Sequence, residues 1–202
     1  MAAALLTKGE RTRAAILDEA LRLVSKAGLD GLTIGTLAEA TGLSKSGLFA
    51  HFGSRDELLL AVLDHGQKQF TEVVLKPALA KPRGVPRVRA MFINWLDWTE
   101  SAELPGGCPM IGGATEFDDR PGPVRDMLAG GQRAWIETLK RAVQQAVEES
   151  QLPAATDPEQ VAFEMFGIAL VVHHHRRLLG YDKARARALG ALDRLLPPRT
   201  SP

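Results

Sequence analysis

The sequence contains a single cysteine and almost no net charge. Cys108 is the one cysteine among 202 residues, so a disulfide within the chain is excluded and nothing indicates export. The 25 lysines and arginines nearly balance the 24 aspartates and glutamates, which leaves a formal charge of +1. A chain of this charge has no strong overall field, so binding to nucleic acid would require basic groups that are concentrated locally.

Long apolar runs are also missing. No stretch approaches the roughly 20 apolar residues that span a bilayer. The most apolar candidate, Phe166–Val172, runs directly into three histidines and two arginines. The apolar run at the start of the chain is too short for a signal peptide. We therefore expect a soluble cytoplasmic protein that does not enter the membrane.

Alternating apolar and polar residues, the pattern of half-buried strands, are nearly absent, whereas apolar residues recur at helical spacing. The sequence therefore predicts an all-α fold, and its 45% hydrophobic content is that of a globular protein. Capping-box spacings begin at Thr7 and Ser54, and an Asp-Pro-Glu-Gln run at Asp157 marks a third helix start. The proline-containing segment 76–86 predicts a connection. The expected helices cover residues 7–27, 33–41, 44–52, 54–76, 87–100, 124–150, 157–179 and 182–196.

Two short helices on either side of Gly42 predict a helix-turn-helix. The motif requires a scaffold helix, a tight turn with a glycine and a recognition helix. Leu43, Leu48 and Phe52 are placed to anchor the second helix to a core. Small and polar groups at the start of such a helix can reach base edges in the major groove. The expected N-cap is Ser44, and the outward-facing residues are Lys45, Ser46, Gly47, Phe49 and His51.

Contacts to DNA phosphates are expected beside this recognition helix. The helices that follow Thr33 and Ser54 begin with free N–H groups and a positive dipole end, and Arg55 adds a cation next to one of them. Residues 1–55 contain seven basic and five acidic residues, so non-specific affinity for DNA should be modest. Further charge could come from an N-terminal arm that contains Lys8, Arg11 and Arg13.

No pattern indicates a metal ion, a cofactor or a catalytic centre. The consecutive residues His173, His174 and His175 point about 100° apart on a helix, so they cannot all face one ion. Asp118 and Asp119 precede an Arg-Pro-Gly-Pro run and predict a turn with a cap. A Ser-His-Asp order, a phosphate loop and a cofactor fingerprint are absent, so we expect no metal, no cofactor and no enzyme activity.

The segment Thr33–Leu58 resembles the signature of the TetR family of transcription regulators. It reads TIGTLAEATGLSKSGLFAHFGSRDEL, with the turn, the aromatic-x-His-Phe run and the Ser-Arg-x-Glu-Leu run in the family's order. The resemblance implies a DNA-binding domain over residues 1–53 and a helical effector-binding and dimerisation domain over residues 54–202, which begins with a linking helix, residues 54–76. Phe49 takes the place of a tyrosine that usually contacts phosphate, so we expect an apolar contact with a thymine methyl or a sugar.

The resemblance also implies a homodimer that binds double-stranded operator DNA, more often as a repressor than as an activator. The apolar stripes of Val124–Ser150 and Asp157–Leu179 are expected to form the dimer interface, although they could instead be core within one chain. Two recognition helices about 34 Å apart would then read the two half-sites of a palindrome.

A small-molecule effector is expected to bind in the C-terminal domain. Tryptophan and methionine suit a roomy, adaptable cavity, although plain core is the simpler role for each residue. The run that starts at Gly106, Gly-Gly-Cys-Pro-Met, resembles an element of TetR-like regulators that respond to electrophiles or oxidants. At a helix start its cysteine would be a sensor; otherwise it is a small buried hydrophobe. The candidate lining residues are Met91, Trp95, Trp98, Cys108, Met110, Phe117 and Trp135.

Two other functions stay open at this point. The chain could be a small helical enzyme that uses Cys108 as a nucleophile, which would require a nearby base. It could also be a ligand-binding protein whose helix-turn-helix has lost DNA binding, which Phe49 and the small local excess of positive charge allow.

Overall fold

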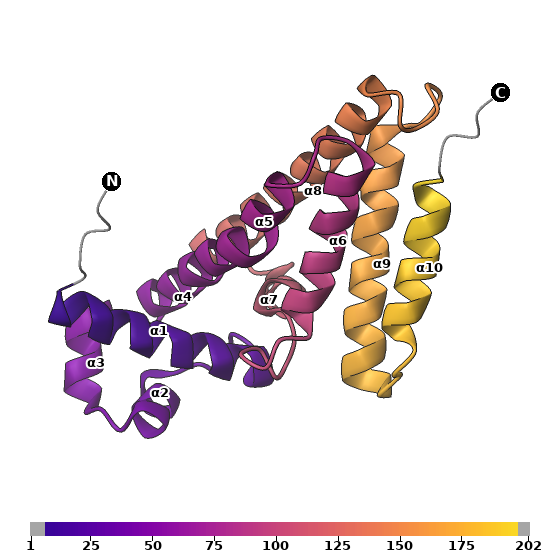
Figure 1. The fold of residues 1–202 in the computed structure, drawn as a ribbon. Helices are drawn as coiled ribbons and strands as arrows, with labels where there is room; N and C mark the ends of the chain where they lie inside the picture. Colours follow the sequence, from indigo (N-terminus) through magenta and orange to yellow (C-terminus); the bar gives the residue numbers. More distant parts are fainter. Residues whose placement is uncertain (1–6, 198–202) are drawn as a thin grey trace. The chain divides into compact units, whose positions relative to one another are not determined.

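Helices make up all the regular structure of the described part of the chain, residues 7–197, in the computed structural model (Figure 1). The predicted all-α fold is confirmed. Two predictions fall outside the described residues. One is the absence of a signal peptide at Met1–Leu6, and the other is the end of the last helix at Pro198. The elements are α1 (Lys8–Ala27), α2 (Ile34–Thr41), α3 (Lys45–Phe52), α4 (Arg55–Phe70), η1 (Thr71–Leu75), α5 (Lys76–Leu79), α6 (Val85–Thr99), α7 (Pro109–Phe117), α8 (Pro123–Glu148), α9 (Pro158–Leu179) and α10 (Ala184–Leu195).

Helix starts follow the predicted caps. At α1 the Thr7 N–H donates to the Glu10 carboxylate at 2.7 Å, and the Glu10 N–H donates to the Thr7 hydroxyl at 3.2 Å. At α4 the Ser54 hydroxyl accepts from the Glu57 N–H at 3.2 Å. At α9 Asp157 accepts from the second and third N–H groups of the helix. Each cap accepts a hydrogen bond from a first-turn backbone N–H that has no partner within the helix. These helix starts are therefore determined by residues close to them in the sequence.

The connection predicted at residues 76–86 begins later than expected, because the helix that starts at Arg55 continues through Pro77. Proline lacks the N–H that an α-helix needs and its ring clashes with the carbonyl four residues back. The turns of η1 are wider, and the Lys76 N–H donates to the Thr71 carbonyl, five residues back. This π-helical turn shifts the hydrogen-bond ladder just before the proline, so the chain stays helical to Leu79.

Packing divides the chain into two compact units. The first contains the chain through Lys68 and also Ala102–Leu128, and the second contains Gln69–Ser101 and the chain from Ala129 onward. The helices α1, α2 and α3 therefore share a unit with α7, while α4 and α8 each contribute to both units. A packing unit is not the same division as a functional domain, so the domain boundary after residue 53 stays a prediction.

The apolar stripes of the two longest helices are buried in the single chain. They are therefore core, which was the alternative to a dimer interface, and a dimer that uses these helices must use their other faces. The buried stripe of α8 contains Trp135, Leu139, Ala142, Val143 and Ala146, and that of α9 contains Val161, Met165, Ala169 and Val172.

Candidate nucleic-acid interface

The turn between α2 and α3 has the geometry of a helix-turn-helix. Gly42 ends α2 with φ 69° and ψ 13°, a left-handed conformation that favours glycine. Ser44 then caps α3, because its hydroxyl accepts from the Gly47 N–H at 3.1 Å. Leu48 and Phe52 are buried and hold α3 to the core of the first unit. Leu43 is exposed instead of anchoring the helix, because it lies in the turn and precedes the cap.

The face of α3 that was predicted to read DNA is open to solvent. Its large apolar member, Phe49, is 52% exposed, so its ring is accessible to a partner. Small side chains beside it leave room for a partner to approach the start of the helix. The exposed residues of this face are Lys45, Ser46, Gly47, Phe49 and His51.

Two of the predicted DNA contacts are helix caps. The Thr33 hydroxyl accepts from the Thr36 N–H at 3.0 Å, as the Ser44 hydroxyl does from Gly47. Both caps remain exposed. Each therefore marks a helix N-terminus whose first-turn N–H groups and dipole can hold a phosphate.

Arg55, the predicted phosphate contact, takes part in an ion-pair network within the first unit. Its guanidinium donates to the Asp30 carboxylate and to the Leu29 carbonyl, each at 3.2 Å. Arg120 donates to the other oxygen of Asp30 at 2.6 Å. The hydrogen bond from Arg120, aided by the two nearby positive charges, holds the pKa of Asp30 below its ordinary value. The network joins the start of α4 to the connection between α1 and α2.

The arm cations are not equivalent. The Arg13 guanidinium lies over the Phe52 ring, 5.2 Å from its centroid, so it packs on the recognition helix by a cation–π contact. Lys8 and Arg11 are exposed on the first turns of α1. These two are placed as free surface charges, whereas Arg13 helps to hold α3.

The segment that contains α7 contacts the end of α1. The Glu116 carboxylate accepts from the N–H groups of Leu29 and Asp30 at 3.1 and 2.9 Å. The Gly106 N–H donates to the Ser25 hydroxyl at 3.2 Å, and a β-carbon on Gly106 would lie 1.5 Å from the Ser25 carbonyl oxygen. Sequence reasoning missed Glu116 and Arg120, since each is more than 80 residues from its partner and no local pattern marks such a pair.

The residues predicted to line an effector pocket belong to different packing units. The first unit holds Cys108, Met110 and Phe117, and the second holds Met91 and the three tryptophans. Cys108 is the N-cap of α7, so the predicted helix start is confirmed, but the side chain is only 3% exposed. Its role as a sensor stays a prediction.

The structure gives no sign of metal binding or of a membrane span in the residues that it describes. Between residues 7 and 197 no three His, Cys, Asp or Glu side chains are grouped so as to hold a metal ion. None of the helices in the same range is long and apolar enough to cross a membrane. Of the three consecutive histidines, His173 and His175 are partly buried and His174 is exposed.

The helical fold with an exposed recognition helix defines a helix-turn-helix regulator, and comparison with known proteins identifies its family. Residues 16–62 match the family model of bacterial regulatory proteins of the tetR family. Residues 84–192, more than half of the chain, match the tetracyclin repressor-like C-terminal domain. The chain therefore belongs to the tetR family.

Curated relatives and solved structures agree with this assignment. The chain is 26% identical to the transcriptional repressor ComR of Escherichia coli over 151 residues, which cover 74% of this chain and 72% of ComR. It is 35% identical to the repressor AcnR of Corynebacterium glutamicum over 74 residues, 37% of this chain and 39% of AcnR.

The fold likeness extends over nearly the whole chain. A TetR regulator from Chloroflexus aurantiacus has a TM-score of 0.83 at 26% identity and covers 93% of this chain and 94% of its own. AibR, in complex with isovaleryl coenzyme A and operator DNA, has a TM-score of 0.76 at 25% identity and covers 94% of this chain and 100% of its own. The protein is a DNA-binding transcription regulator.

Proposed function

We propose that this regulator is a repressor that binds a palindromic operator as a homodimer and releases it when a small-molecule effector binds. The observation that carries the proposal is the outer face of α3, which is exposed and mostly small or polar while Leu48 and Phe52 hold its inner face in the core. The relatives ComR and AcnR are repressors. AibR is described in complex with isovaleryl coenzyme A and operator DNA, so a protein of similar fold binds both a small molecule and DNA.

In this proposal α3 reads bases and its neighbours hold phosphates. Lys45 can donate to guanine oxygen and nitrogen acceptors in the major groove, and His51 lies about 1.7 turns further along the helix. Phe49 contacts a thymine methyl or a sugar. The helix N-termini at Thr33 and Ser54 receive phosphates, while Ser44 caps α3 itself. Ser46 and Gly47 complete the base-facing surface.

Arg55 reaches a phosphate by exchanging partners. In the free protein its guanidinium is half exposed and paired with Asp30. Arg120 also pairs with Asp30, so the carboxylate keeps a cation when Arg55 turns toward DNA. The exchange therefore leaves no buried charge unpaired, and its net cost is small.

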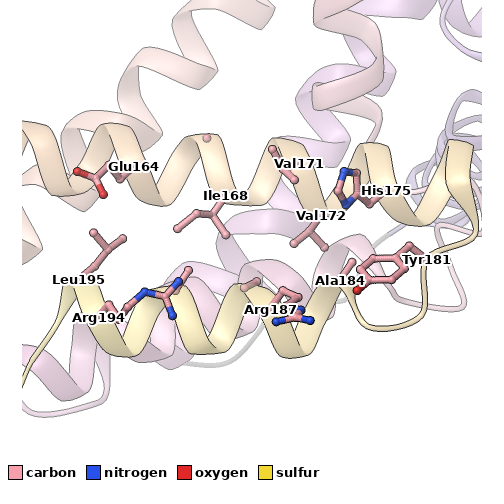
Figure 2. Close-up of a pocket in the computed structure, with 13 residues that line it drawn as sticks. Glu164, Ile168, Val171, Val172, His175, Tyr181, Ala184, Arg187, Arg194 and Leu195 are labelled. Carbon is pink, nitrogen blue, oxygen red and sulfur yellow. The ribbon is translucent and has the colours of Figure 1, made fainter.

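The dimer surface is proposed on α9 and α10. Phe163 and Leu178 are 71% and 70% exposed, and with Leu170 and Val171 they follow one helical stripe along the outer side of α9. Beside this stripe α9 and α10 enclose a groove of about 730 Å³, in which their side chains face one another (Figure 2). An exposed apolar stripe of this length is covered in most proteins, and a second copy of α9 fits it because a two-fold interface pairs a surface with itself.

The dimer surface can be tested by charge. We expect that Phe163→Glu combined with Leu178→Glu gives a monomer in sedimentation equilibrium and lowers operator affinity, because each carboxylate would have to be desolvated in the interface. Val73 of η1 is also exposed, and Val73→Glu is the matched control that should remain dimeric. A dimer that survives the double substitution would place the interface elsewhere.

The effector is proposed to act through the second unit. Phe70 ends α4 inside an aromatic cluster of that unit, and the same helix begins at Arg55 in the network that holds the α1–α2 connection. The helix α4 thus begins at the ion-pair network of Arg55 and ends in the aromatic cluster. An effector can release DNA only if it binds the non-binding conformer more tightly. As a regulator of bacterial DNA the protein is proposed to work in the cytoplasm and to have no enzyme activity.

Selection of binding sites from random DNA by the purified protein tests the proposal. We expect a palindrome whose half-sites are centred one helical turn or a multiple of it apart. Recovery of a palindrome would support operator binding and dimerisation together. Folded protein that enriches no sequence at low salt would contradict the proposal.

A further inference from the structure

One face of α7 holds the connection between α1 and α2 within the first unit. The Glu116 carboxylate accepts from the N–H groups of Leu29 and Asp30 at 3.1 and 2.9 Å. Gly113 precedes Glu116 by three residues and so lies on the same face of the helix. A β-carbon added to Gly113 would lie 2.5 Å from Cδ1 of Leu29, so this glycine lies directly against that side chain. The face of α7 therefore contacts both the main chain and a side chain of the connection.

The connection is shaped around the carboxylate. Two consecutive N–H groups that point to one acceptor form a small anion-binding concavity. Gly28 precedes them with φ 75°, in the left-handed region that favours glycine. A β-carbon on Gly28 would lie 2.5 Å from Oε1 of Glu116, so a larger residue would displace the carboxylate. The backbone of residues 28–30 thus forms a binding site for the Glu116 carboxylate.

The same connection leads directly into the first turn of α2. The Thr36 hydroxyl accepts from the Thr33 N–H at 2.9 Å and lies 3.1 Å from the Gly31 carbonyl, to which it can donate. These contacts tie the start of α2 to the residue that follows Asp30. A shift of the connection would therefore move the first turn of α2, where the first N–H groups of the helix have no partner within it.

We propose that Glu116 is a positioning residue for DNA binding: it holds the connection so that the start of α2, at Thr33, meets a DNA phosphate. The inference rests on the proposed function, which places a phosphate there. A donor that is already held in its bound position loses less conformational freedom on binding, so holding it raises affinity. The charge of Glu116 acts in the opposite direction, because a carboxylate near the operator repels phosphates. Positioning and charge therefore predict opposite effects when the carboxylate is removed.

Glu116→Ala separates the two effects, with Asp119→Ala as the matched control. Both substitutions remove one negative charge from the same segment, and Asp119 is exposed. We would measure the binding of the full-length protein to a random-sequence duplex and to the selected operator. Phosphate contacts do not depend on sequence, so Glu116→Ala should bind both duplexes roughly tenfold more weakly than the wild type. Asp119→Ala should bind as tightly as the wild type or more tightly, and neither substitution should change base preference.

Amide signals show whether the contact itself is responsible. In proton–nitrogen correlation spectra of the free protein, Glu116→Ala should move the amide protons of Leu29 and Asp30 upfield, as loss of a hydrogen bond does. When the random-sequence duplex is added, the amide protons of Ile34 and Gly35, the first two residues of α2, should move downfield in the wild type and less in the variant. A purely structural role would lower the midpoint of thermal unfolding but leave these shifts, and the affinity of the folded fraction, unchanged.

A milder variant keeps the test decisive if Glu116→Ala does not fold. Glu116→Gln keeps the length of the side chain and one carbonyl acceptor, so its affinity for both duplexes should lie between those of the wild type and Glu116→Ala. It should still bind more weakly than Asp119→Ala, which has the same charge.

Three results would overturn the inference: equal affinities of the Glu116 variants and Asp119→Ala, amide signals of Leu29 and Asp30 that do not move, or a loss confined to the operator with altered base preference. If the wild type selects a palindrome while these variants bind it equally, the inference fails and the proposed repressor function stands. If it selects none, the proposed function fails, whereas the positioning role is still measured on the random-sequence duplex. Wild-type protein that binds no duplex at low salt would contradict both.

Discussion

The two packing units are held together in different ways. In the first, main chains meet closely: Gly106 lies against the Ser25 carbonyl, and Glu116 accepts from the N–H groups of Leu29 and Asp30. In the second, large side chains pack as an aromatic cluster, and within residues 7–197 the indole N–H groups of Trp98 and Trp135 have no hydrogen-bond acceptor. The first unit thus relies on close polar contacts of the main chain, and the second on packed aromatic side chains.

The difference predicts how each unit responds to change. Exposed groups on α3 would give up water when they bind DNA, and the DNA would release counterions. Their contribution to operator affinity therefore depends on salt. The buried side chains of the aromatic cluster are shielded from bulk ions. Their contribution to the free energy of unfolding should therefore not depend on salt. The first unit should tolerate new surface side chains but not a change of backbone spacing.

The largest effect is expected from Gly106→Ala. The new β-carbon would lie 1.5 Å from the Ser25 carbonyl oxygen, so α1 or the segment before α7 must move. Overpacking of this kind costs about 1–3 kcal/mol or more. Thermal and urea unfolding measure the loss. Gly112→Ala is the control, because Gly112 lies in α7 with no atom within 4 Å of its added β-carbon and should be neutral or stabilising. Equal stability of the two variants would refute the close contact at Gly106.

A smaller effect, on operator binding, is expected when either of two cations of the first unit is removed. One substitution should change base preference and the other should change the salt dependence of binding. Lys45→Ala removes a base contact, so operator affinity should fall by about 1–3 kcal/mol and base preference should relax at one position. Arg55→Ala removes a phosphate contact, so all sequences should bind more weakly and the slope of log affinity against log salt should decrease by about 1. Operator binding over a range of salt concentrations measures both. A wild-type slope for Arg55→Ala would rule out the phosphate role.

Phe49→Tyr should strengthen operator binding. Phe49 is exposed, so an added hydroxyl meets no core and can donate to a phosphate. A hydrogen bond to a charged group contributes about 1.5–3 kcal/mol at most, and less where the group stays hydrated. Fluorescence anisotropy with labelled operator gives the affinity. A weaker complex would show that the added hydroxyl meets an apolar surface of the DNA instead of a phosphate.

The smallest effect is expected from pH, and it should arise in the second unit. Burial, followed by the charges of Arg177 and His174, lowers the pKa of His173. The folded chain therefore holds the proton less well than the unfolded chain, so stability is complete above about pH 6.5 and falls as the pH drops through that value. Unfolding free energies between pH 7.5 and 5.5 should fall less for His173→Gln than for the wild type. A fall of the same size in His173→Gln and in the wild type would contradict this assignment.

Much of the DNA-binding region was predictable from the sequence. The caps Thr33 and Ser44, the turn at Gly42 and the buried pair Leu48 and Phe52 all lie within 20 residues. Caps and turns depend on atoms a few residues apart, so their signals survive in a linear pattern. The length of α4 was less predictable, since Pro77 marked an end that a π-helical turn avoids.

The sequence by itself determined most of the helices, the caps at their starts and the outward face of α3, because each follows from local hydrogen bonds and from helical spacing. The short helix α7 was not among the expected helices. Only the tertiary structure decided that Arg55 pairs with Asp30 and Arg120, that the stripes of α8 and α9 are core, and that two indole donors lie buried without acceptors. The ion pairs among these features join residues that are 25 to 90 positions apart in the sequence. The physical reason is that a stripe or a charge in a sequence shows what a side chain can contact, whereas packing decides which contact is made.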